Sequence, residues 1–127
     1  MEMGRREFIA VAAAVAAGPA LGARPEAKDM YGLIGKMLAV PGQRDALIAI
    51  LLEGTGAMPG CLSYIIAKDP AEADAIWVTE VWDSKASHEG SLSLPAVKNA
   101  ITQGKPLIAK FASHVVTEVV GGHGLAR

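Results

Sequence analysis

The side chains best suited to moving a proton lie close together in the middle of the chain. Glu80 falls on a stretch in which every second residue points to one face of a strand, and the other members of that face are apolar: Ile76, Val78 and Trp82. A carboxylate there needs a partner or takes a raised pKa. His88, with an ordinary pKa of about 6.5, can accept a proton near neutral pH. We therefore predict that His88 and Glu80 are catalytic; a structural histidine and a structural hydrogen bond or ion pair are the alternatives.

Four further side chains could contact a bound small molecule. Trp82 could form an apolar wall of a pocket or belong to the plain core, and Tyr64 could donate a hydrogen bond or simply pack. Asn99 and His114 complete the predicted substrate-binding set. Both have an alternative: Asn99 lies in the middle of a predicted helix and could be exposed to solvent, and His114 begins a predicted strand and could lie at the edge of the sheet.

Metal and disulfide chemistry are not expected. The three histidines, at positions 88, 114 and 123, lack the spacing of metal ligands. His123 lies among glycines, and we expect it to take no part in a site. Cys61 is the single cysteine, so neither an internal disulfide nor a paired-cysteine metal site can form. We interpret it as a small buried apolar residue.

These candidates need a scaffold, and the pattern of the chain predicts one of strands and helices. Strands are expected over 30–40, 61–68, 75–83 and 113–120, and helices over 41–54, 84–92 and 95–111. Ser84 suits an N-cap, while Gly104 and Pro106 should bend or interrupt the last helix. The order β-α-β-β-α-α-β predicts an α+β, ferredoxin-like domain, in which helices cover one face of an antiparallel four-stranded sheet.

The predicted strands are apolar on both faces. In the third strand, Ile76 and Val78 lie on one side and Trp77 and Val81 on the other, although a sheet with one face in water alternates apolar and polar residues. Helices cover only one face. Leaving the other in water costs roughly several kcal/mol, at about 25 cal/mol per Å² of apolar surface. We therefore expect a second copy of the sheet to cover it, which makes a homodimer.

The first 23 residues differ from the rest. Arg5-Arg6 precedes Phe8-Ile9 and a run without charge up to Ala23, shorter than the roughly 20 apolar residues of a membrane-spanning helix. Such a segment is typical of a cleavable export signal of the twin-arginine type; an uncleaved anchor or N-terminal arm is the alternative. We predict a periplasmic or secreted protein with a signal peptide over 1–23, a linker over 24–29, the domain over 30–121 and a tail over 122–127.

Length and charge narrow the function classes. The chain has 127 residues, 51% of them hydrophobic and 20% charged, and a net charge of −1. This length allows one domain behind the leader, and the apolar content argues for a packed core. A nearly neutral chain gives no support for nucleic acid or an anionic membrane as a partner.

The segment Thr79–His88 resembles the Glu-x-Trp-x-Ser motif of antibiotic biosynthesis monooxygenase domains and, more narrowly, a bacterial subgroup of quinol monooxygenases. The similarity continues through 91–97 and 105–109 and ends at 121–125, so it spans the predicted domain. It implies the dimeric α+β barrel of that family. Relatives include quinol oxidisers, haem degraders and isomerases, so the resemblance is stronger evidence for the fold than for the substrate.

The resemblance implies a cofactor-independent monooxygenase, in which an ionised quinol or similar electron-rich aromatic reduces dioxygen without metal or flavin. The protein would supply a dry pocket, a base and a wall for the ring. Haem degraders are said to use an Asn on the first strand, where this chain offers Tyr31, Gly32 and Lys36, so haem is not the expected substrate. A non-catalytic periplasmic dimer that binds small hydrophobic molecules is the second hypothesis. A cavity lined by Glu80 or His88 favours the enzyme, and a wholly apolar one favours the binder.

Export can be tested directly. Replacing the pair by Arg5→Lys and Arg6→Lys should block export, because the twin-arginine route requires the guanidinium pair. In the unchanged protein the mature chain should begin between Leu21 and Pro25. N-terminal sequencing of the periplasmic fraction measures this, and an intact Met1 in that fraction contradicts it.

Overall fold

The computed structural model describes residues 29–125. The predicted leader over 1–23 and most of the predicted linker lie outside these residues. The described elements are, in chain order, β1 (Tyr31–Ala39), α2 (Arg44–Gly54), β2 (Cys61–Lys68), β3 (Ala75–Trp82), α3 (Lys85–Ser91), α4 (Pro95–Gly104), a 3-10 turn (Lys105–Leu107) and β4 (Ile108–Glu118).

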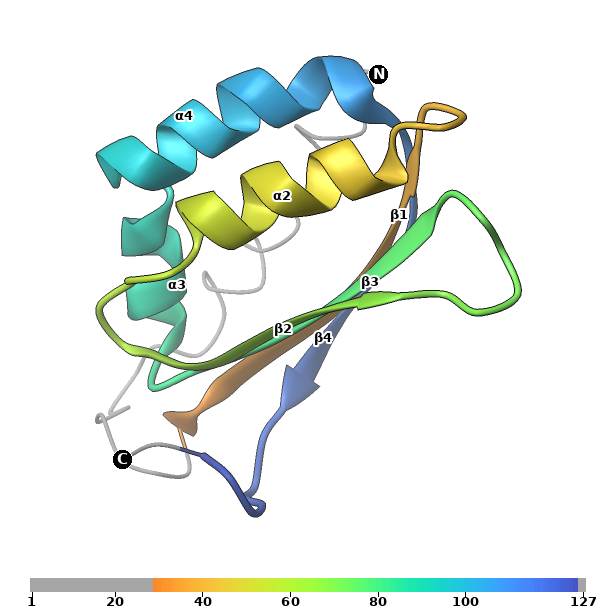
Figure 1. Cartoon of the computed structure of the whole chain (residues 1–127). Helices are drawn as coiled ribbons and strands as arrows, with labels where there is room; N and C mark the ends of the chain where they lie inside the picture. Colours follow the sequence, from red (N-terminus) through yellow and green to blue (C-terminus); the bar gives the residue numbers. More distant parts are fainter. Residues whose placement is uncertain (1–28, 126–127) are drawn as a thin grey trace.

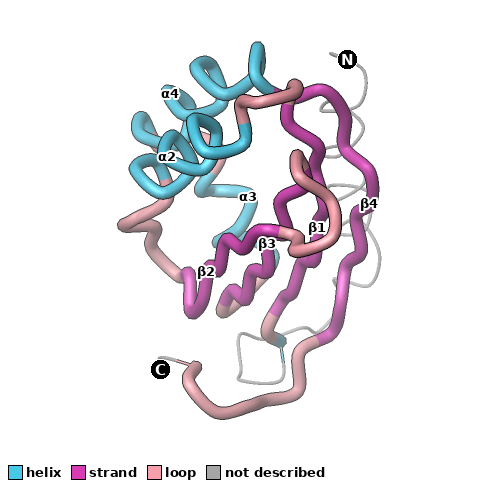
Figure 2. The backbone as a smooth tube through the Cα atoms, turned by 45° about the vertical axis from the view of Figure 1, so that its right-hand side comes forward, coloured by secondary structure: helices cyan, strands magenta, loops and turns pink. Residues whose placement is uncertain are grey.

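The strands form one antiparallel sheet in the order β2-β3-β1-β4. The three helices pack on one face of this sheet (Figure 1), and Figure 2 shows the other face free of the described helices. The predicted element order and the α+β, ferredoxin-like class are confirmed. In the register, Glu80 of β3 stands between Leu33 of β1 and Tyr64 of β2, so the predicted site begins at the middle of the sheet.

The predicted end of the last helix is wrong. α4 stops at Gly104, a 3-10 turn follows, and Ile108 already opens β4. Pro106 lacks an N–H and interrupts the helix there. Ile108 and Phe111 are three residues apart, a spacing that favours a helix, because such a pair would face opposite ways in a regular strand. Irregular pairing of β4 with β1 near Leu38 lets both side chains reach the helix side.

The core on the helix side divides into two groups of buried side chains. The first surrounds Leu47 of α2, and the second surrounds Trp82 of β3. Burying one large apolar side chain stabilises a fold by about 1.5–3 kcal/mol. Tyr64 of β2 packs against both groups, and it therefore lies where they meet.

Two glycines let the helix layer close over this region. A Cβ at Gly54, the last residue of α2, would overlap the side chain of Ala100 in α4. Gly60, before β2, has φ of +84°, and a Cβ there would overlap Ser87 in α3. The loop over residues 55–60 is thus held against α3, beside His88.

The opposite face of the sheet is apolar at several positions. Ile65 is 56% exposed and Val115 is 51% exposed. Trp77 lies on the same face, where its Nε1 donates to Asp69 at 2.9 Å and Lys36 lies over its ring. Within residues 29–125, every helix is too short or too polar to cross a membrane.

Candidate active site

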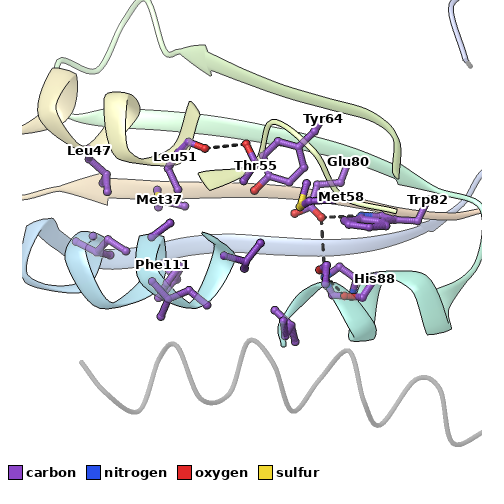
Figure 3. Close-up of a pocket in the computed structure, with 17 residues that line it drawn as sticks. Met37, Leu47, Leu51, Thr55, Met58, Tyr64, Glu80, Trp82, His88 and Phe111 are labelled. Atoms are coloured by element: carbon purple, nitrogen blue, oxygen red, sulfur yellow. Dashed lines mark hydrogen bonds and ion pairs between the residues drawn. The ribbon is translucent and has the colours of Figure 1, made fainter. Parts of the chain in front are cut away.

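A cavity of about 140 Å³ lies between the inner face of the sheet and the helices. Both residues predicted to be catalytic line it. In Figure 3, Glu80, Trp82 and His88 gather at one end, and the labelled side chains at the other end are apolar: Leu47, Met37 and Phe111. The cavity is therefore polar at one end only.

Glu80 supplies the buried carboxyl group of the site. It lies on β3 between apolar neighbours and is only 8% exposed. Its carboxyl accepts a hydrogen bond from Trp82 Nε1 at 2.9 Å to Oε1. Burial raises the pKa of Glu80 to about 7, and the hydrogen bond from Trp82 partly opposes this rise. Glu80 therefore exchanges a proton readily at neutral pH.

His88 reaches the same end of the cavity from α3. Ser84 caps this helix as predicted, because its Oγ accepts from Ser87 N at 3.1 Å. His88 Nε2 lies 3.9 Å from Glu80 Oε1, beyond hydrogen-bond distance. His88 Nδ1 is buried without a hydrogen-bond partner among the described residues. The ring lies 5.4 Å from the Trp82 ring, in an edge-on arrangement.

Burial makes His88 a weak base. It lowers the pKa of His88 to about 4, with Glu89 acting in the opposite direction and Lys85 and His114 adding to the fall. The imidazole is consequently neutral at pH 7, and its contact with Glu80 is not an ion pair. A neutral imidazole can still donate or accept a hydrogen bond.

Trp82 and Tyr64, which are predicted to contact a substrate, both line the cavity. Trp82 is also part of the core and is 1% exposed, so the two interpretations of this residue coincide. Burial, together with the nearby Glu80, raises the pKa of Tyr64. The Tyr64 hydroxyl therefore stays protonated.

The structure does not bring Asn99 or His114 to the cavity lining. Asn99 lies on the exposed side of α4 and accepts a hydrogen bond from Gln103 at 3.4 Å. His114 is half-buried on β4, and burial lowers its pKa. Cys61 is also half-buried, with its Sγ at 3.5 Å from the Ser63 carbonyl oxygen.

Several lining residues escape a search for chemical groups in the sequence. Met37, Leu51 and Phe111 shape the apolar end, and Ser91 lies beside His88. Alternation along the first strand marks the inward face that carries Met37, but no local signal separates a side chain that lines a cavity from one that fills the core. Among the described residues, no three His, Cys, Asp or Glu side chains come together in a way that could hold a metal ion.

The raised pKa of Glu80 predicts a pH-dependent stability. In the unfolded chain its pKa returns to the ordinary value of 4.5. The folded state therefore binds more protons between about pH 4.5 and 7, and stability falls as pH rises through that window. Glu80→Gln keeps the volume of the side chain and the hydrogen-bond acceptor for Trp82 but cannot ionise. Between pH 5 and 8 the free energy of unfolding should therefore fall by about 2–3 kcal/mol more in the wild type than in this variant.

Urea unfolding at both pH values measures this difference. His88 titrates in the opposite sense but is present in both proteins, so its contribution cancels in the comparison. If the free energy of unfolding depends on pH equally in the wild type and the variant, Glu80 has the same pKa in the folded protein as in the unfolded chain.

Comparison with known proteins agrees with the fold. The family model described as antibiotic biosynthesis monooxygenase matches residues 30–103. A crystal structure from Chloroflexus aurantiacus that bears this family name is 66% identical, with a TM-score of 0.75, and the match covers 76% of this chain and 99% of that one. A Deinococcus radiodurans structure shares the fold at 23% identity, with a TM-score of 0.62 over 76% of this chain and 99% of that one.

A more distant relative adds only a partial match. An uncharacterized protein of Synechocystis is 26% identical over 89 residues, which are 68% of this chain and 60% of that relative's length. The chain thus spans less than two thirds of that relative. The family model, however, matches more than half of this chain, and the Chloroflexus structure is 66% identical to it. This chain therefore belongs to the antibiotic biosynthesis monooxygenase family.

Proposed function

We propose that this protein is a monooxygenase that oxidises quinols, or similarly electron-rich aromatics, with dioxygen and without a bound cofactor. The observation that carries the proposal is the Glu80 carboxyl, buried at the polar end of an otherwise apolar cavity. With a pKa of about 7, it can take the proton of a phenol at neutral pH. The phenolate reduces dioxygen far better than the neutral phenol does. Family membership supports the class of reaction.

The substrate itself can supply every electron that dioxygen needs. A dihydroxybenzene loses a proton to Glu80 and gives one electron to dioxygen. The superoxide and the semiquinone radical then join at a ring carbon, and the outer oxygen takes the proton back from Glu80. Loss of the ring hydrogen as a proton and cleavage of the O–O bond release water and leave a hydroxyquinone. Quinol plus dioxygen therefore gives hydroxyquinone plus water, with no external reductant.

Within this proposal Glu80, rather than His88, is the base. With the pKa of His88 lowered to about 4, the protonated imidazole would be too acidic to hold a phenol proton at neutral pH. His88 Nε2, close to the carboxyl, is the hydrogen-bond partner of the substrate oxygen. Trp82 forms the wall against the ring, and Tyr64 is a second donor at the cavity surface.

A non-catalytic dimer that binds small hydrophobic molecules is the competing function. A wholly apolar cavity would favour it. Glu80 and His88 line the cavity, and a buried carboxyl costs free energy that an aliphatic side chain would not. This cost is explained if the carboxyl moves a proton, and the enzyme is therefore the better hypothesis.

The proposed place of action is the periplasm or the extracellular medium, on the basis of the twin-arginine-like leader. The twin-arginine route carries folded proteins, so the domain would fold, and dimerise, before export. The proposal of export stands apart from the chemistry, since the cavity is the same in either compartment.

A homodimer built on the open face of the sheet is part of the proposal. Ile65 and Val115 are about half exposed there, on either side of a face that also carries Trp77. Large apolar side chains left exposed on one face of a sheet favour a partner, and a second copy of the same face is self-complementary under two-fold symmetry.

The role of Glu80 predicts an activity loss and a pH profile. Glu80→Gln should lower quinol-dependent oxygen uptake by about 10²–10⁴-fold, because the base is gone while the volume remains. In the wild type, kcat/KM should rise with pH through about 7, following ionisation of Glu80. Oxygen-electrode assays with a panel of hydroquinones, catechols and naphthoquinols, against boiled enzyme, measure both.

His123→Ala is the matched control, because His123 is exposed near the end of the chain and away from the cavity. It should keep full activity. An inflection near pH 4 in place of 7 would return the role of base to His88, and full activity of Glu80→Gln would remove Glu80 from the chemistry.

The dimer predicts twice the monomer mass in light scattering, with an interface of at least about 1,000 Å². Val115→Lys should give monomers, because the new charge would be buried against the second sheet. Leu52→Lys, on an exposed position of α2, should remain dimeric. A stable wild-type monomer at micromolar concentration contradicts the proposal.

A further inference from the structure

We propose that the cavity selects a single-ring aromatic molecule whose hydroxyl groups lie on adjacent carbons, that is, a ligand of the catechol type. The inference rests on the proposed function in taking the occupant of the cavity to be the substrate. It adds the number of rings and the positions of the hydroxyl groups. Three observations carry it: the volume of the cavity, the groups at its polar end and the apolar nature of the other end.

The volume limits the number of rings. The cavity measures about 140 Å³, and an apolar cavity of about 150 Å³ holds a benzene-sized molecule. Sites for larger ligands run to about 300–1,000 Å³. The walls are a paired sheet and helices that meet closely at Gly54 and Gly104, and close-packed walls do not expand easily. A fused two-ring ligand therefore exceeds the volume of this cavity.

The groups available to a ligand are the Glu80 carboxyl, the His88 ring and the hydroxyl of Tyr64, a residue that pairs with Glu80 in the register of β2 and β3. Among the described residues, the one hydrogen bond to the Glu80 carboxyl comes from Trp82 and goes to Oε1, so Oε2 is left for a ligand. The His88 side chain makes no hydrogen bond with any residue that the structure describes. The hydroxyls of Thr55 and Ser91 both donate to main-chain carbonyls, at 2.7 and 2.6 Å, so their protons are already used.

This arrangement distinguishes hydroxyl patterns. Glu80 Oε1 and His88 Nε2 are 3.9 Å apart, close enough for two neighbouring hydroxyls of one ring to reach the two groups at once. A hydroxyl on the far side of the ring would instead point toward Leu47, Met37 and Phe111 (Figure 3). None of the described residues at that end offers it a hydrogen-bond partner, and an unpaired buried hydroxyl weakens binding.

Two isomers of equal size test the hydroxyl pattern. 4-Methylcatechol and methylhydroquinone have the same formula and differ only in the place of one hydroxyl. Calorimetric titration of the whole mature protein under argon should show at least roughly tenfold tighter binding of 4-methylcatechol. Argon prevents turnover, so affinity is measured without chemistry. Equal affinity of the two isomers would overturn the inference.

A second arm tests the size limit. 1,2-Dihydroxynaphthalene keeps the adjacent hydroxyls but adds a ring, and it should bind the wild type at least roughly tenfold more weakly than 4-methylcatechol. Leu51→Ala enlarges the cavity and should restore its binding. Leu52→Ala, one residue further along α2 but exposed, should not. Tight binding of the two-ring ligand to the wild type would overturn the inference, whether or not the Leu51 variant folds.

The two proposals fail in different ways. Catechol-selective binding under argon without oxygen uptake in air supports the ligand class and contradicts the monooxygenase. Oxygen uptake at equal rates with one-ring and two-ring quinols, or with the two methyl isomers, supports the monooxygenase and contradicts the ligand class.

Discussion

Burial of a single carboxyl group determines how the inner half of this domain is arranged. Glu80 stands on the central part of the sheet, where an aliphatic residue would be more favourable, because moving an unpaired carboxylate out of water is costly. Two features of the domain reduce this cost. Trp82 supplies an indole N–H, and the pKa rises until the group is neutral for about half of the time near pH 7.

The same strand serves the two faces of the sheet. β3 carries Glu80 and Trp82 toward the helices, and Trp77 and Val81 toward the open face. Because successive residues of a strand point to opposite sides, a shift of register by one residue would exchange the site with the open face. Pairing on both edges of β3, with β1 and β2, holds the register and so keeps the carboxyl inside.

The sequence predicted the positions of site residues where a local pattern, such as the alternation along a strand, indicated them. Alternation along residues 75–83 placed Glu80 and Trp82 on the buried side, and the N-cap at Ser84 located the helix that carries His88. The sequence could not predict which of Glu80 and His88 is the stronger base at neutral pH. The pKa of His88 depends on atoms that come from distant parts of the chain, among them His114. Its neutral form was expected, but its weakness as a base was not.

The errors have equally specific causes. Ile108 and Phe111 show helical spacing, and only the irregular pairing of β4 with β1 explains how a strand can present both on one side. Asn99 lies on α4, a helix that lines the cavity with other residues. Its side chain points away from the cavity, because the buried positions of α4 are Val97, Ala100 and Gly104. A residue type alone does not tell which side of a helix faces the core.

The chain has only two tryptophans, and the fold separates them. Trp82 lies in the inner wall with its indole bonded to the carboxyl, while Trp77 lies on the open face beneath Lys36. Their fluorescence consequently reports two different events: the emission of Trp82 follows the charge of Glu80 and the filling of the cavity, and that of Trp77 follows the wetting of the open face. With one indole replaced by phenylalanine at a time, the protein contains its own optical probe for each side of the sheet.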